Sequence, residues 1–171
     1  MTVRPIVALG NAVLRNTSRK VSRYDPSLRK LVHDMIETMR DAPGVGLAAP
    51  QIGVPLQVAV VEAEKDEIYV LVNPKIIKSE GEQILDEGCL SVPGYWGKVK
   101  RFETVTVKAR DAHGKEIRIV GAEGLLGQAL QHEIDHLNGM VYVDRLDSLD
   151  GLQRVSRHER ARSVDQAVEA E

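Results

Sequence analysis

The chain has 171 residues, of which 43% are apolar and 4% aromatic, with 23 basic side chains against 25 acidic ones. This length suits one domain with a single core. Because the net charge is close to neutral, there is no excess of basic side chains to displace counterions from DNA. The low aromatic content excludes a base-stacking platform. We therefore expect no direct DNA binding. The single cysteine excludes an intramolecular disulfide and is typical of a reducing compartment.

Neither the N-terminal region nor the most apolar stretch favours a membrane location. Residues 1–16 lack a long apolar run followed by a small-residue cleavage site, so no secretory signal is expected. The stretch 45–61 is the most apolar, but prolines, glutamines and a glycine interrupt it, which excludes a membrane span. The sequence therefore predicts a cytoplasmic protein that does not contact membranes.

The first half of the chain predicts one helix followed by strands. Asp25 before Pro26 is typical of a helix N-cap, and the Pro43-Gly44 pair ends the helix. Two runs rich in apolar or β-branched residues, 56–61 and 68–77, predict strands. The apolar stripe of the helix recurs at helical spacing and consists of Leu28, Leu31, Val32, Met35, Ile36 and Met39.

The second half predicts a β-hairpin, a second helix and a charged end. A strand over 98–111 is followed by a turn and a strand over 116–120. A helix from about Ala122 to Leu137 ends at Asn138-Gly139. We expect one domain over 1–146 and a charged surface helix or flexible tail over 147–171. The element order is typical of an α+β domain with mainly antiparallel sheets.

The strongest chemical signal is the H-E-x-x-H pattern at 132–136. Residues four apart on a helix differ by about 40° in direction, so His132 and His136 can bind one metal ion. Leu125 and Ala129 share their stripe, which predicts that this face of a central helix packs against the core. Glu133 points about 100° away from His132 and lies near leucines. Desolvation there disfavours the charged carboxylate, which suits a group that takes up and releases protons near neutral pH.

The alternative interpretation of this pattern is that the two histidines serve only in helix packing. A chance H-E-x-x-H is expected roughly 0.01 times in a chain of this composition, which favours the metal site. Catalytic zinc-type centres usually have three protein ligands, so a third is required. As this third ligand, Cys89 is favoured, because a loop or strand end can present its thiol. His158 and Glu159 are less suitable, because they lie among arginines, which disfavour binding of another cation. For a single thiol, simple packing is the competing interpretation.

A third segment, GVGLAAPQIG at 44–53, combines glycines, small residues and one amide. Glycines permit close backbone approach or positive φ, and the amide of Gln51 can donate to a developing oxyanion. The segment lacks both common phosphate-loop patterns. Taken alone, it also fits an ordinary structural turn.

Together the three segments resemble the signature motifs of the peptide deformylase family. Residues 44–51 match G-φ-G-φ-A-A-x-Q, residues 87–91 are identical to E-G-C-L-S, and residues 131–136 match Q-H-E-x-D-H. The likeness runs from about residue 4 to residue 145. One departure is Trp96, which stands where many bacterial members carry an arginine, so substrate contacts there are expected to differ.

The resemblance implies a metal-dependent hydrolase that removes the formyl group from the N-terminal formyl-methionine of newly synthesised proteins. It implies that Cys89, His132 and His136 hold one divalent metal whose bound water attacks the formyl carbonyl, with Glu133 as general base and acid. The family is known for Fe²⁺, and the thiolate donor also suits Zn²⁺, Ni²⁺ or Co²⁺.

The same resemblance assigns the substrate contacts. The side chain of Gln51 and the backbone N–H of Leu90 would stabilise the oxyanion, while Val45 and Gly46 would contact the substrate backbone. The implied partners are formylated nascent polypeptides, with transient contact to the ribosome. From the residues alone, a small H-E-x-x-H metallopeptidase and a closed structural metal site remain the alternatives.

Overall fold

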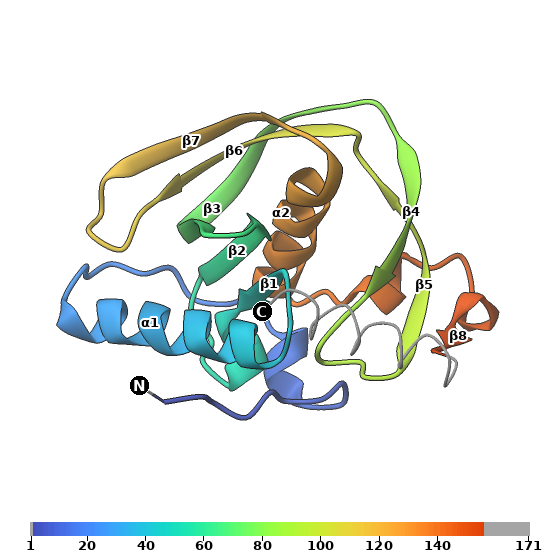
Figure 1. The fold of residues 1–171 in the computed structure, drawn as a ribbon, viewed down its shortest axis with the longest axis horizontal. Helices are drawn as coiled ribbons and strands as arrows, with labels where there is room; N and C mark the ends of the chain where they lie inside the picture. Colours follow the sequence, from blue (N-terminus) through green and yellow to red (C-terminus); the bar gives the residue numbers. More distant parts are fainter. Residues whose placement is uncertain (1, 156–171) are drawn as a thin grey trace.

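Two antiparallel sheets form the framework of the computed structural model, which describes residues 2–155. The larger sheet has the strand order β1-β2-β3-β6-β7, with bounds Gly46–Ala48, Val58–Glu64, Glu67–Glu80, Thr104–Arg110 and Glu116–Ala122. The smaller sheet has the order β4-β5-β8, with bounds Gln83–Gly88, Tyr95–Arg101 and Gln153–Arg154. In Figure 1, helix α2 (Gly124–Leu137) lies between the two sheets. The α+β class with antiparallel sheets is therefore confirmed.

The other long helix, α1, spans Pro26–Asp41 and begins as the sequence predicts. The side chain of Asp25 accepts hydrogen bonds from the backbone N–H groups of Ser27 and Leu28, which otherwise lack partners at a helix start. Short 3₁₀ helices complete the structure: η1 (Ala12–Arg15), η2 (Ala49–Ile52), η3 (Tyr142–Arg145) and η4 (Leu149–Gly151).

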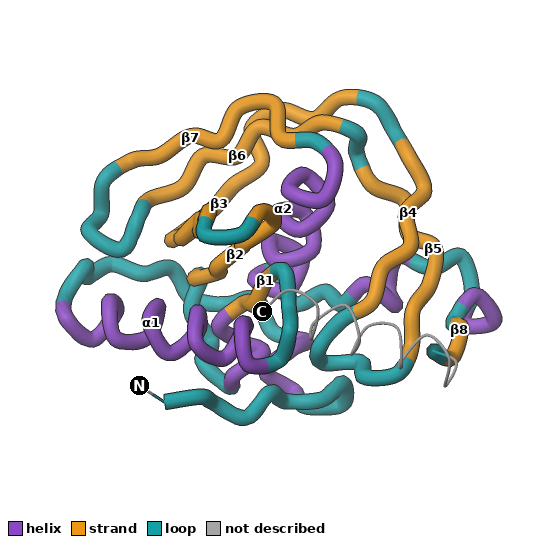
Figure 2. The backbone as a smooth tube through the Cα atoms, viewed as in Figure 1, coloured by secondary structure: helices purple, strands orange, loops and turns teal. Residues whose placement is uncertain are grey.

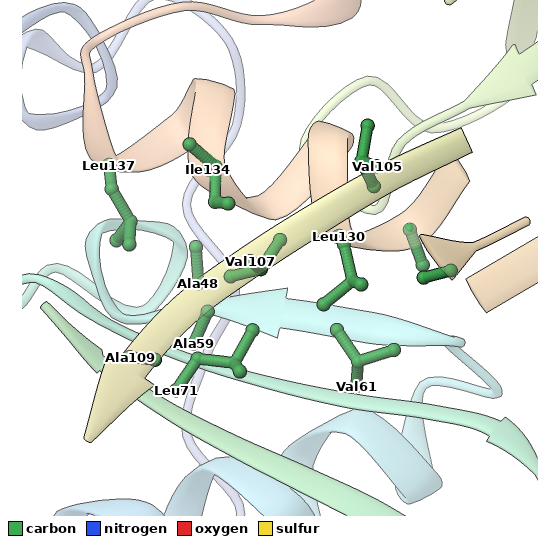
Figure 3. Packing of buried hydrophobic residues seen from close by; sticks show 12 residues of the cluster. Ala48, Ala59, Val61, Leu71, Val105, Val107, Ala109, Leu130, Ile134 and Leu137 are labelled. Atoms are coloured by element: carbon green, nitrogen blue, oxygen red, sulfur yellow. The ribbon is translucent and has the colours of Figure 1, made fainter. Parts of the chain in front are cut away.

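Strand β2 separates two hydrophobic clusters because successive strand residues point to opposite faces. Val58 and Val60 pack in the cluster that includes the buried face of α1, whereas Ala59 and Val61 pack in the cluster that includes α2. Figure 3 shows the second cluster, in which Leu130, Ile134 and Leu137 of α2 lie against strands of the larger sheet. This packing fixes the rotation of α2 about its axis.

The prediction of one strand over 98–111 is wrong. The chain forms β5 and β6 there, in different sheets, and residues 102–103 separate them, as the loop-coloured break in Figure 2 shows. The side chain of Gln131 on α2 explains the break. Its amide oxygen accepts from the backbone N–H of Phe102 and its amide nitrogen donates to the Phe102 carbonyl, replacing bonds to a neighbouring strand.

Other predicted boundaries need smaller corrections. Helix α2 begins at Gly124 rather than Ala122, because Ala122 ends β7 and pairs with Val105 of β6. The prediction that Leu125 faces the core is also wrong, since it is 50% exposed. Strand β3 extends to Glu80, beyond the apolar run that predicted it, because pairing with β6 continues through its charged end. Strand β4 was not predicted as a separate strand.

The chain beyond residue 146 enters the smaller sheet before the described part ends. Gln153 and Arg154 pair with β5, and residues 156–171, which hold most of the predicted helix or tail, lie outside the described residues. The domain boundary at 146 stays a prediction. Among residues 2–155, no helix is long and apolar enough to cross a membrane.

Candidate active site

The three predicted metal ligands lie together. Cys89 follows the last residue of β4, and His132 and His136 project from α2, so that one ligand atom from each lies within 4.8 Å of the others. The Nε2 atom of His136 is 3.3 Å from the Cys89 Sγ atom and 3.1 Å from the His132 Nε2 atom. In a tetrahedral site, bond lengths of about 2.0–2.1 Å to nitrogen and 2.3 Å to sulfur place ligand atoms roughly 3.3–3.6 Å apart. The donor set therefore fits a divalent metal.

The environments of the two histidines have opposite effects on metal binding. Burial lowers the pKa of His136, which favours the neutral imidazole that binds metals. Burial alone would lower the pKa of His132, but hydrogen bonds with Cys89 and Glu87 outweigh it and raise that pKa. Because the raised pKa favours protonated His132, a metal ion competes with a proton for this imidazole, and we expect metal binding to release a proton.

Glu133 lies on the adjacent face of α2 and lines a cleft together with Cys89 and His132. Only 3% of the residue is exposed, and burial raises the pKa of its carboxyl to about 7. Its Oε2 atom is buried and makes no hydrogen bond within the described part of the chain. Such a carboxyl is able to take up and release a proton near neutral pH.

The amide of Gln51, from η2, is oriented toward the metal ligands. Its Oε1 atom accepts a hydrogen bond from the Ala48 N–H at 2.8 Å, which fixes which end of the amide points inward. The Nε2 group then lies 3.3 Å from Ser91 Oγ and 3.5 Å from Cys89 Sγ. The amide therefore presents N–H donors next to the cysteine ligand, and the predicted 44–53 turn is β1 followed by η2.

A cleft of about 490 Å³ brings the predicted substrate contacts together with the metal ligands. Gly46 lies at the start of β1, and the exposed Leu125 of α2 lines the opening. The lining includes Gly44, Val45, Gly46, Gln51, Glu87, Cys89, Leu90, Pro93, Gly94, Leu125, Gln128, His132 and Glu133. All predicted site residues except His136 line this cleft, and His136 is buried directly behind it.

A chain of charged side chains lies behind His132, and no sequence pattern predicts it. The Nδ1 atom of His132 is hydrogen-bonded to Glu87, and the guanidinium of Arg101 binds both carboxylate oxygens of Glu87. Arg101 also donates to Asp135, which accepts two further bonds from Arg145, an exposed residue at the end of this chain of charges. The available signal in the sequence was that Glu87 and Asp135 are acidic residues inside two of the motifs. Buried carboxylates require partners, so these two residues indicate that charged partners lie nearby.

This network fixes the charge of Glu87. Burial alone would raise the pKa of Glu87, but hydrogen bonds from His132 and Arg101 outweigh it and lower the pKa to about 2. Glu87 is therefore a carboxylate at neutral pH. A carboxylate on one ring nitrogen of a histidine orients the imidazole and makes its other nitrogen a better metal ligand.

Comparisons with known proteins agree with this arrangement. The profile of the polypeptide deformylase family matches residues 3–151. A peptide deformylase of Dehalococcoides mccartyi is 49% identical over 156 residues, covering 91% of this chain and 93% of its own. One from Chloroflexus aurantiacus is 43% identical and covers 98% of this chain and 100% of its own.

Solved structures show the same fold. The crystal structure of a peptide deformylase from Legionella pneumophila is 47% identical with a TM-score of 0.84, covering 99% of this chain and 97% of that chain. One from Synechococcus elongatus in complex with actinonin is 40% identical with a TM-score of 0.81, covering 96% of this chain and 87% of that chain. With sequence, fold and site in agreement, the chain belongs to the peptide deformylase family, whose metal-dependent enzymes remove formyl groups from protein N-termini.

Proposed function

We propose that the cleft binds the formyl-methionine end of nascent polypeptides and that Cys89, His132 and His136 hold the divalent metal that this reaction needs. The observation that carries the proposal is the convergence of these three ligand atoms within 4.8 Å, beside the buried carboxyl of Glu133. When bound, such a metal polarises the formyl carbonyl and lowers the pKa of water enough to make it a nucleophile.

Glu133 carries the proton in this proposal. Its Oε2 atom, which makes no hydrogen bond to any of residues 2–155, accepts the proton of the attacking water, and its pKa of about 7 allows it to return that proton to the leaving amine. Gly46 lies directly against this carboxyl and limits its movement. The products are formate and the free amino end of the polypeptide.

Gln51 and Leu90 stabilise the negative charge that develops on the formyl oxygen. The Gln51 amide is held by Ala48 with its N–H donors toward Cys89, so it needs no reorganisation during the reaction. Leu90 follows the cysteine and lines the same cleft, where its backbone N–H is the second donor. Gly46, the first residue of β1, and Val45, which precedes it, contact the substrate backbone.

We further propose that the physiological metal is Fe²⁺ and that the protein works in the cytoplasm with transient contact to the ribosome. One thiolate with two imidazoles suits borderline ions such as Fe²⁺ and Zn²⁺ better than Mg²⁺ or Ca²⁺. Nascent chains carry the formyl group as they leave the ribosome, which supports the cytoplasmic location and the ribosome contact.

The test is formate release from formyl-Met-Ala-Ser by protein purified without oxygen, together with metal analysis of the same sample. We expect about one metal per chain, formate release, and no cleavage of unformylated Met-Ala-Ser. Removal of the metal with a chelator is expected to abolish turnover, and Fe²⁺ is expected to restore it. Cleavage of the unformylated peptide without formate release would overturn the proposal in favour of a metallopeptidase.

A further inference from the structure

One rim of the cleft is the stretch between Cys89 and strand β5. Leu90, Pro93 and Gly94 from this stretch line the cleft. The Val92 N–H donates to the Cys89 carbonyl, which forms a tight turn, and Gly94 has a φ of +83°, a conformation that favours glycine. The first half of the rim is held by the Leu9 N–H, which donates to the Ser91 carbonyl at 2.8 Å, whereas the position of Pro93 and Gly94 depends on what holds the far end.

Strand β8 holds that far end. Arg154 pairs with Tyr95 and Gln153 pairs with Trp96, directly after the rim, and the Val155 N–H donates to the Gly94 carbonyl at 2.9 Å. The Arg154 guanidinium also lies 5.9 Å from the centre of the Tyr95 ring and 3.5 Å from its hydroxyl. The last described residues thus bond to a residue that lines the cleft.

The approach to β8 is closely packed against β5. A β-carbon on Gly97 would lie 2.8 Å from the Leu146 side chain and 3.4 Å from the Gly151 carbonyl. Leu146 and Leu152 pack against the buried cluster that also contacts Cys89. The match to the family profile ends at residue 151, so Gln153, Arg154 and Val155 lie beyond it.

We propose that the segment 153–155 is a positioning element for substrate binding: through the bond from Val155 to Gly94, it sets the cleft rim against the bound peptide. The inference rests on the deformylase function of the cleft. The segment carries neither a metal ligand nor a proton-transfer group, so it acts on peptide binding rather than on bond breaking. A rim that is already in place avoids the entropy lost when a loop is ordered by its ligand.

The test compares Val155→Pro with Val155→Ala in the full chain, with formyl-Met-Ala-Ser as substrate. Proline removes the backbone N–H that bonds to Gly94, whereas alanine retains it. Loss of one hydrogen bond predicts an increase in KM of about 2- to 10-fold for Val155→Pro, with kcat within about 2-fold of the unmodified protein. For Val155→Ala we expect a clearly smaller change in KM. Metal content and melting temperature, measured on each variant, check that the site and fold are intact.

Two results would overturn the inference: an unchanged KM in Val155→Pro, whether or not kcat falls, or an equal rise in KM in Val155→Ala. If Val155→Pro does not fold, Arg154→Met decides, because it removes the contacts with Tyr95; an unchanged KM there also contradicts the inference. Failure of the unmodified protein to release formate would contradict the proposed function instead.

Discussion

Gly46 lies so close to Glu133 that a β-carbon at residue 46 would overlap the Glu133 carboxyl. The Glu133 Cγ and Cδ atoms would each be 2.9 Å from that β-carbon, and the carboxyl is buried, so the side chain has little room to move away. The backbone of β1 at Gly46 and the Glu133 side chain of α2 are therefore packed directly against each other in the cleft.

Gly46→Ala is therefore expected to displace the Glu133 carboxyl. Misplacement of a catalytic group by about 1 Å costs roughly 10²-fold in rate, so we expect a loss of that order in kcat with metal content retained. Gly151→Ala is the matched control, because a β-carbon at residue 151 has no neighbour within 4 Å. Equal kinetics in the two variants would show that the contact with Glu133 is unimportant.

Removal of the Gln51 amide tests its role at the formyl oxygen. Loss of one oxyanion donor lowers kcat by roughly 10²–10³-fold, which is the change we expect for Gln51→Ala. KM and metal content are expected to change little, because the side chain is not a metal ligand. An unchanged kcat, measured by formate release, would refute the oxyanion assignment.

The identity of the third metal ligand tests the proposed site against that of a metallopeptidase. Cys89→Ala is expected to remove stoichiometric metal and to lower turnover by orders of magnitude, since two imidazoles remain. Glu159→Ala is expected to leave metal content and turnover near those of the unmodified protein. Metal analysis with formate release on both variants checks this, and the opposite pattern would make Glu159 the ligand.

The carboxylate behind His132 is expected to tune metal affinity. Glu87→Gln keeps the shape of the side chain but removes the charge that faces His132 and Arg101. Replacement of such a partner typically lowers metal affinity about 10- to 100-fold, and we expect a loss in this range by competition with a chelator. Glu82→Gln is the control, because Glu82 is exposed and pairs only with Lys100 among the described residues. Equal affinity in both variants would contradict the role of Glu87.

Stability at acidic pH is expected to depend on Asp34, which is buried on α1. Hydrogen bonds from Lys30 and Arg4 lower the pKa of Asp34 below its ordinary value of 3.8. Because the folded pKa is the lower one, the stabilisation is present above about pH 4 and is lost as the pH falls through the folded pKa. The difference in unfolding free energy between the unmodified protein and Asp34→Asn should shrink as the pH falls below 4. Urea unfolding at several pH values measures it, and a constant difference would contradict the expectation.

Most features that depend on neighbouring residues could be predicted from the sequence. The cap at Asp25 and the end of α1 follow from local backbone preferences, and both were found where expected. The two histidines of the proposed metal site also follow from local geometry, because residues four apart on a helix share a face. The position of Gln51 relative to Cys89 was available only through the resemblance to a family, since no local rule connects them.

The features that the sequence could not supply depend on contacts between distant residues. The break between β5 and β6 exists because Gln131, on another element, binds the backbone of Phe102. Similarly, the partners of Glu87 are set by how β4, β5 and α2 pack together. Spacing along the chain thus determined which residues can bind a metal, because helical geometry is local. Only the tertiary structure decided which carboxylates, arginines and strands surround them, because those neighbours are brought together by packing of the two sheets and α2.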